Sequence, residues 1–211
     1  MSTRSARKFV WHACLALPLV AVGCSRESQE KIRTDELIAK VEALGGTSSR
    51  EPDQPTGPVR SIDLSEKKVD DQALTTLVQT HALGSLRTLD LSKTGVTGAG
   101  LAKLKGLKDL EMIDLGDSKI NDPDLEPLTS LPNLKDLGLN STQITNAGLE
   151  FLKAVPHLET LDLSNTAIDD AGLEPLKSLK HLTILKLSET KVTDAGVESL
   201  KKALPECNIE R

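Results

Sequence analysis

One pattern of leucines recurs along this chain about every 24 residues, and it constrains the fold more than any other feature of the sequence. Aligned on Leu-x-x-Leu-x-Leu, the last five complete copies begin 24 residues apart, and the first begins 27 residues before the second. A partial seventh copy begins at Glu206 and places Ile209 where Leu185 stands in the copy before it. A period of roughly 20–50 residues is typical of solenoid proteins. The complete copies begin at Val59, Leu86, Leu110, Leu134, Leu158 and Leu182.

Each copy has the parts of a strand, a turn and a short helix. Leucines at alternate positions, such as Leu89 and Leu91, predict a strand that points both side chains to one side. A Thr or Ser follows at the turn in five copies, and in all six a residue that favours helix N-caps precedes the helical segment. Pro127 and Pro175 lie inside two of these segments, where we expect 3-10 turns because proline removes a helix hydrogen bond. The turn residues are Thr94, Ser118, Thr142, Thr166 and Thr190, and the capping residues are Asp70, Thr97, Asn121, Thr145, Asp169 and Thr193.

A single copy is too small to fold alone. Its few apolar side chains bury too little surface to offset the conformational entropy of the ordered residues. Stacking the copies pairs their strands and buries both flanks of each copy. The turn Thr or Ser is then expected to be buried and to bond the backbone of neighbouring copies.

The consensus L-x-x-L-x-L-x-x-T-x-V/I-T-D-A-G-L resembles the leucine-rich repeat family. The resemblance implies an α/β fold: a right-handed solenoid with a parallel β-sheet on the concave side and short α or 3-10 helices on the convex side. It implies a repeat domain over residues 59–211, made of six units plus a partial seventh, with Thr or Ser where many members have Asn or Cys. The T-D-A-G-L flavour is also similar to the repeats of F-box substrate-recognition subunits, although no F-box segment is present.

Residues 1–23 have the pattern of a signal peptide. A basic start precedes an apolar run over residues 9–22, which is too short to span a bilayer. The run ends in AVGC, which resembles the lipobox of bacterial lipoproteins, with Ala21 where the family usually has Leu. The resemblance implies that Cys24 is the acylated first residue of a mature, extracytoplasmic protein, lipid-anchored to the bacterial cell membrane or outer membrane. An ordinary secretory signal with an incidental Cys24 is the alternative.

Two further segments are predicted to connect this anchor to the repeats. Residues 24–33 are polar and indicate a short lipidated tether. Thr34 is the expected N-cap of a helix that Gly45 ends, because glycine suits the C′ position. Residues 47–58 indicate a loop or a short edge strand. We expect residues 34–58 to form an N-terminal helical cap and loop, because a repeat array must cover its first apolar cross-section.

Two columns of side chains are expected to face outward on the concave side. The first is largely acidic, and its aspartates either bind a basic partner or a cation, or are a habit of the repeat in which each Asp bonds a nearby Ser92 or Ser164. Two carboxylates on adjacent strands also have the spacing of a retaining glycosidase, so a carbohydrate-active enzyme is a further alternative. In the second column, Met112 and Ile184 are the exposed apolar candidates. The first column runs Asp63, Asp90, Asp114, Gly138, Asp162 and Lys186.

The convex side offers two smaller candidates. Phe151 stands between Pro127 and Pro175 in adjacent units, and the three side chains either pack together or form a patch for a partner. His157 and His181 occupy equivalent positions one unit apart, so their rings would lie close together. Two imidazoles fall short of the three or four ligands of a zinc site.

Charge and composition narrow the function. A formal net charge of −5 argues against nucleic-acid binding, which needs a basic surface. No cysteine spacing indicates a zinc site, and nothing in the sequence points to a cofactor. The sequence therefore predicts a membrane-anchored protein–protein interaction module without catalysis, whose protein partner is unidentified and basic. A structural envelope spacer without a specific partner is the alternative.

Overall fold

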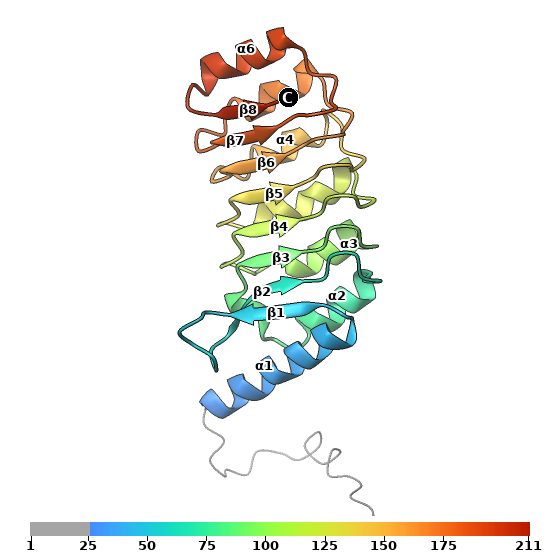
Figure 1. The fold of residues 1–211 in the computed structure, drawn as a ribbon, viewed down its shortest axis with the longest axis vertical. Helices are drawn as coiled ribbons and strands as arrows, with labels where there is room; N and C mark the ends of the chain where they lie inside the picture. Colours follow the sequence, from blue (N-terminus) through green and yellow to red (C-terminus); the bar gives the residue numbers. More distant parts are fainter. Residues whose placement is uncertain (1–25) are drawn as a thin grey trace, which may run out of the picture.

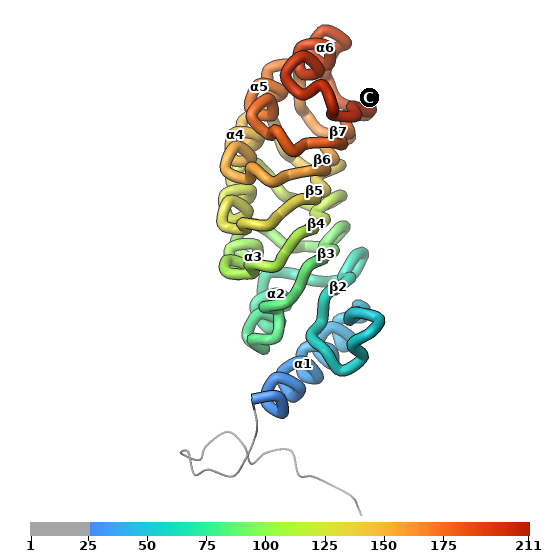
Figure 2. The backbone as a smooth tube through the Cα atoms, turned by 90° about the vertical axis from the view of Figure 1, so that its left-hand side faces the viewer, coloured from blue at the N-terminus to red at the C-terminus, as the bar shows by residue number. Residues whose placement is uncertain are grey.

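The described part of the chain is an elongated stack of repeating units. The structure is a computed structural model that describes residues 26–211. One sheet runs along the stack in the order β1 to β8 (Figure 1). The helices lie on the side of the stack opposite the strands (Figure 2), so the sheet is open and its outer face is uncovered. This is the α/β leucine-rich-repeat solenoid that the sequence predicts.

The strands and helices alternate along the chain. The strands are β1 (Thr47–Arg50), β2 (Val59–Asp63), β3 (Thr88–Asp90), β4 (Met112–Asp114), β5 (Asp136–Gly138), β6 (Thr160–Asp162), β7 (Ile184–Lys186) and β8 (Asn208–Glu210). The α-helices are α1 (Arg26–Ala43), α2 (Asp71–Val78), α3 (Gly98–Leu101), α4 (Leu149–Leu152), α5 (Leu173–Leu176) and α6 (Asp194–Ala203). The 3-10 helices are η1 (Leu83–Ser85), η2 (Ala102–Leu104), η3 (Asp122–Ser130) and η4 (Asp170–Gly172).

The central apolar residue of each strand lies in one continuous buried row. The parallel register from β3 to β7 aligns these residues, and none of them is more than 2% exposed. Because each strand supplies one residue to the row, every unit completes the core of its neighbours. The row confirms the predicted strand phase and consists of Leu89, Ile113, Leu137, Leu161 and Leu185.

The turn Thr and Ser residues bond within their own unit rather than across units. Thr94 donates from Oγ1 to the Leu91 carbonyl at 2.6 Å, and Thr166 donates to the Leu163 carbonyl at 2.6 Å. The expectation that stacked neighbours satisfy these hydroxyls is therefore wrong. A carbonyl three residues back is already within reach, because the chain turns sharply after each strand.

One residue in each turn has a left-handed backbone, and its N–H reaches the next unit. Lys93 has φ of 56° and donates to the Gly116 carbonyl at 2.8 Å. The equivalent N–H groups of Glu66, Asp117, Ser141 and Asn165 donate to the following unit in the same way. The positive φ therefore directs a backbone donor along the stack.

Five helical segments begin at the predicted caps, but helix α4 begins four residues after Thr145 and has Gly148 at its N-cap. Asp70 accepts from the Ala73 N–H at 2.9 Å, and Thr193 accepts from the Gly196 N–H at 3.3 Å. Pro127 lies in the 3-10 helix η3, as expected. Pro175 instead lies in the short α-helix α5, because the first turn of a helix has no hydrogen bond for proline to remove.

The N-terminal cap differs from the sequence prediction in where its helix starts. Helix α1 begins at Arg26, so most of the expected tether is helical, and Thr34 is a buried mid-helix residue that donates to the Glu30 carbonyl at 2.9 Å. The first half of α1 could not be predicted as helix from its polar sequence, because only the second half of the helix has a buried apolar face. Gly45, with φ of 79°, occupies the C′ position as predicted, and β1 pairs antiparallel with β2. No helix in residues 26–211 is both long and apolar enough to cross a bilayer.

Candidate functional site

The open face of the sheet carries two parallel columns of side chains. The strand register places Thr88 beside Met112 in one column and Asp90 beside Asp114 in the other. The same register continues through all the parallel strands, so both predicted columns exist. In strands β2–β7 these columns hold five aspartates and one lysine.

The aspartates of the acidic column are each held by their own loop. Asp63 accepts from both the backbone N–H and the hydroxyl of Ser65. Asp90 accepts from Ser92 in the same way, at 2.9 and 2.7 Å. Asp162 accepts from the Ser164 N–H at 3.0 Å. These hydrogen bonds within the loops are the structural role that was predicted as the alternative to a binding strip. They use only part of each carboxylate, so other lone pairs remain free to accept hydrogen bonds.

A hollow interrupts the column at Gly138. It has a volume of about 140 Å³ and lies between Asp114 on β4 and Asp162 on β6. A Cβ on Gly138 would collide with Asp114 Oδ1, so the hollow depends on this glycine. Lys186 lies 3.6 Å from Asp162 and partly neutralises the C-terminal end of the hollow.

The carboxylates of the column do not titrate alike. Partial burial raises the pKa of Asp114, and the negative charges of Asp90 and Asp162 act in the same direction, against the hydrogen bond from Gly116. The hydrogen bonds from Ser65 hold the pKa of Asp63 below its ordinary value. Of these two aspartates, Asp114 is therefore the one whose negative charge costs more in the folded protein.

The exposed apolar candidates do not form a joint patch. Met112 is 38% exposed and Ile184 is 37% exposed, and they lie on β4 and β7. Three strand spacings separate them, which is about 14 Å. Each can make only a local apolar contact within a mainly polar face.

The predicted convex patch is not an exposed surface. Pro127 and Pro175 are buried, and Phe151 is partly buried and packs against the core. The repeat turns these three side chains inward at this position, so they do not form the exposed patch that was one of the two alternatives.

The remaining predicted residues fall outside a site or outside the described chain. The rings of His157 and His181 lie 5.7 Å apart, as predicted from their equivalent positions. Within residues 26–211, no group of three or more His, Cys, Asp or Glu side chains could hold a metal. Cys207 is buried, and burial raises the pKa of its thiol. Cys24 and residues 1–23 lie outside the described residues.

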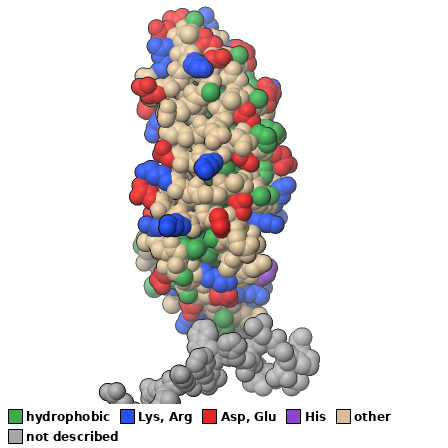
Figure 3. Space-filling model, turned by 90° about the vertical axis from the view of Figure 1, so that its right-hand side faces the viewer, with side chains coloured by type: hydrophobic (Ala, Val, Ile, Leu, Met, Phe, Trp, Pro, Cys, Tyr) green, Lys and Arg blue, Asp and Glu red, His purple; other side chains and the backbone are tan. Residues whose placement is uncertain are grey.

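Charges on the side of the stack shown in Figure 3 are mixed. Lys and Arg side chains alternate there with Asp and Glu, and no large area of one sign is visible.

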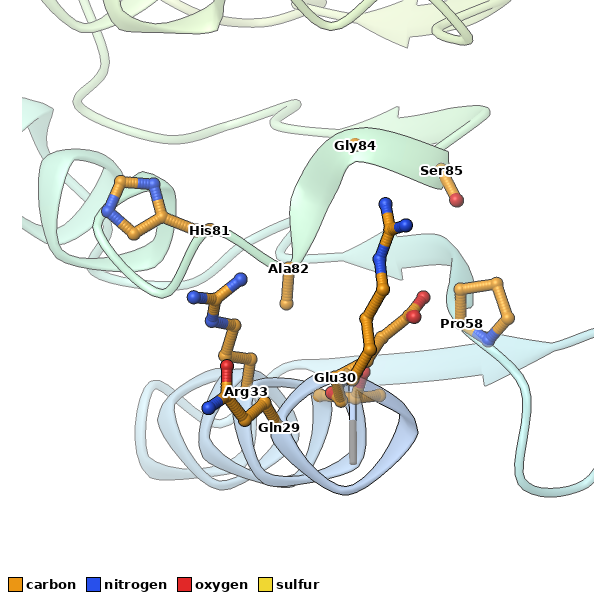
Figure 4. Close-up of a pocket in the computed structure, with 10 residues that line it drawn as sticks. Gln29, Glu30, Arg33, Pro58, His81, Ala82, Gly84 and Ser85 are labelled. Carbon is orange, nitrogen blue, oxygen red and sulfur yellow. Dashed lines mark hydrogen bonds between the residues drawn. The ribbon is translucent and has the colours of Figure 1, made fainter. Parts of the chain in front are cut away.

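The sequence reasoning missed a cleft beside helix α1. It separates the first half of α1 from the loop around η1 (Figure 4). The cleft escaped notice because residues 26–33 were expected to be a tether without structure. The arginines in this stretch, spaced seven residues apart, were the signal that could have found it.

Comparisons with known proteins identify the repeat. The family model described as leucine-rich repeat matches residues 79–198. No curated protein matches the sequence. Among solved structures, an internalin from Listeria monocytogenes is 21% identical with a TM-score of 0.51, over 78% of this chain and 51% of the internalin.

Two further solved structures give the same result. A leucine-rich repeat protein from Leptospira interrogans is 24% identical with a TM-score of 0.51, over 64% of this chain and 33% of that protein. Internalin C2 from L. monocytogenes is 22% identical with a TM-score of 0.54, over 86% of this chain and 85% of that protein. This chain thus spans about half of the first structure and a third of the second, and likeness at these identities concerns the fold alone.

Proposed function

Because the leucine-rich repeat model matches more than half of its length, the chain belongs to that family, and we propose that it is a protein–protein interaction module whose concave face binds the partner. The observation that carries this proposal is the contrast between the two faces of the sheet. The inward positions are Leu or Ile in nearly every unit, whereas the outward positions differ from unit to unit. Outward residues on a rigid sheet are free to suit a partner without disturbing the core.

The charge of the concave face favours a basic partner. Its outward side chains on β2–β7 comprise five aspartates and one lysine, a net charge of −4. Such a surface steers a positively charged protein and excludes an acidic one. Asp63, Asp90, Asp114 and Asp162 supply most of this charge, while Met112 and Ile184 offer single apolar contacts.

A charge-neutralising triple variant tests this face. Asp90→Asn, Asp114→Asn and Asp162→Asn together remove three charges, while each Asn keeps an oxygen for the loop hydrogen bonds. A partner captured by the wild type from an envelope extract should be lost, and its capture should weaken as salt rises. The matched control is Glu189→Gln, Glu198→Gln and Glu206→Gln, which removes three exposed carboxylates away from the concave columns. Unchanged capture by the Asp variant would exclude the acidic face as the binding surface.

We also propose that the protein is an extracytoplasmic lipoprotein anchored through Cys24. The support is the lipobox-like AVGC sequence and the start of helix α1 at Arg26, two residues after Cys24. The fold would then lie directly against the bilayer. Growing cells fed a palmitate analogue should label the wild type and not Cys24→Ala, and label that persists in the variant would refute the anchor.

A spacer without a specific partner is the competing function. It is favoured by the absence of Trp, Tyr and Arg from the outward positions of β3–β7, because these residues dominate interface hot spots. Cross-linking in intact envelopes separates the two functions. One dominant cross-linked neighbour supports the interaction module, whereas a diffuse set that varies between repeats supports the spacer.

A further inference from the structure

The cleft beside α1 is lined by groups suited to an anion. It has a volume of about 260 Å³ between α1 and the loop at residues 81–85. In Figure 4 the side chains of α1 form one wall and this loop forms the other. The lining groups that matter here are Arg26, Gln29, Glu30, Arg33 and Ser85.

Both arginines of this cleft lack a partner in the described structure. Neither Arg26 nor Arg33 makes an ion pair or a side-chain hydrogen bond within residues 26–211. Every other arginine in that range is engaged, so the two free guanidinium groups are concentrated in one place. The engaged pairs are Arg50 with Asp35, Arg60 with Glu51, Arg87 with Glu51 and Glu111, and Arg211 with Asp194.

The spacing of the arginines lets them act on one ligand. Arg26 and Arg33 are seven residues apart, so two helical turns bring them to the same face of α1. Guanidinium groups bind phosphate oxygens through paired N–H donors. The Gln29 amide and the Ser85 hydroxyl add neutral donors to the lining.

We propose that this cleft binds a phosphate group. The Glu30 carboxylate lies in the same cleft and makes no ion pair within residues 26–211, and the charged lining sums to +1, from two arginines and one glutamate. A phosphate group offers separate oxygens to the two guanidinium groups, while the negative charge of Glu30 weakens the site. Replacing Glu30 should therefore strengthen phosphate binding, whereas replacing an arginine should weaken it.

The phosphate has two conceivable sources, a phospholipid headgroup and free phosphate. The cleft lies at the N-terminal end of the stack, where α1 begins two residues after Cys24. A headgroup source rests on the proposed anchoring at Cys24, but the cleft and its chemistry depend neither on the anchor nor on the concave face. Failure of this proposal therefore leaves the proposed function standing, and the reverse also holds.

Titration of the full-length protein in a non-ionic, phosphate-free detergent tests the site. The arginine side-chain NMR signals are followed on adding inorganic phosphate, a short-chain phosphatidylglycerol below its micelle concentration, or sodium chloride at equal ionic strength. We expect saturable shifts at Arg26 and Arg33 with a phosphate compound and not with chloride. The compound that saturates at the lower concentration identifies the source.

The variants make opposite predictions. Arg33→Gln should weaken binding about tenfold, because a charge-assisted pair is lost. Glu30→Gln should tighten it about twofold, because a nearby like charge is removed from an exposed site. Lys201→Gln with Lys202→Gln, at the far end of the stack, should leave it unchanged. Weakening by Glu30→Gln, equal weakening by the lysine pair, or a chloride response equal to that of phosphate would overturn the proposal.

Discussion

At the scale of the residue, the repeat fixes the backbone conformation of one turn position in each unit, although the residue type at that position varies. The left-handed non-glycine residues have φ between 53° and 60°, and they include Glu, Lys and Ser as well as the types that favour this region, which are His81, Asp117 and Asn165. Five of the seven, in the turns of successive units, donate their N–H to the next unit. Because the bond to the next unit is made by the backbone N–H, it does not depend on the side chain. Several residue types therefore occur at this position despite the strain of positive φ, and no single type marks it in the sequence.

Relief of this strain should stabilise the protein. Asp117 has φ of 53°, is exposed and makes no side-chain hydrogen bond with the described part of the chain. Asp117→Gly should raise the free energy of unfolding by about 0.5 kcal/mol, because glycine adopts positive φ without a clash but adds entropy to the unfolded chain. Urea denaturation measures the change. Lys119→Gly, an exposed position without positive φ, should instead lower stability by about 0.5–1 kcal/mol, and a loss in both variants would contradict the strain argument.

The raised pKa of Asp114 predicts a pH-dependent gain from its neutralisation. Because its pKa is higher in the folded state than in the unfolded state, its charge opposes folding at neutral pH, and this cost disappears as pH falls below its ordinary value of 3.8. Asp114→Asn should therefore stabilise the protein by about 0.5 kcal/mol at pH 7, discounted for its exposure, and by nothing near pH 3. Thermal unfolding at both pH values measures this. A variant less stable at pH 7 would show that the Gly116 hydrogen bond outweighs the burial.

At the scale of the element, carboxylates join the helical segment of one unit to that of the next. Asp122 accepts from the Thr145 N–H and hydroxyl at 2.7 and 2.6 Å, and Asp170 accepts from Thr193 in the same way. The glycine of T-D-A-G-L makes room for this carboxylate, since a Cβ on Gly148 would lie 2.5 Å from Asp122 Oδ1. The capping residues could be predicted from the sequence. The bonds between units could not, because helix-cap preferences describe one helix at a time.

At the junction between the second and third units, the carboxylate comes from the later unit and bonds back to the earlier one. Gly98 stands where other units have Asp or Asn, and Asp124 stands where four of the other units have glycine and the first has alanine. Asp124 reaches back to the Gly98 N–H at 2.9 Å and also accepts from the Asn121 N–H at 3.0 Å. The two departures from the repeat compensate for each other.

A double-mutant cycle tests that compensation. Gly98→Asp alone should destabilise the protein by about 2 kcal/mol, because the new side chain meets Asp124, and Asp124→Gly alone should cost about 1 kcal/mol through lost hydrogen bonds. The double swap restores the usual order and should return stability to within about 0.5 kcal/mol of the wild type. Urea unfolding gives the four free energies, and additive losses would show that the two positions are not coupled.

At the scale of the whole molecule, the parts set by periodicity were predictable and the parts set by the ends were not. The dry row through Leu89 and Leu161 follows from spacing alone, as do the two concave columns. The early start of α1 does not follow from spacing. Residues 26–33 carry no stripe of apolar residues, and the buried face of the helix lies in its second half. One wall of the cleft at Arg26 and Arg33 is formed by the first half of α1, so the cleft could not be predicted without that part of the helix.

A linear stack also predicts how the molecule responds to damage. Each unit touches only its neighbours, so a defect at the end should unfold locally, whereas a defect in the middle weakens both halves. Leu37 in α1 and Leu161 in β6 are both fully buried. Each change to Ala should cost about 3 kcal/mol at its own site. Native-state hydrogen exchange should then show faster exchange confined to α1, β1 and β2 in Leu37→Ala, but spread from β4 to β8 in Leu161→Ala. Uniform loss of protection in both variants would mean that the stack unfolds as one cooperative block, and the N-terminal cap would then help to hold the distant concave face in shape.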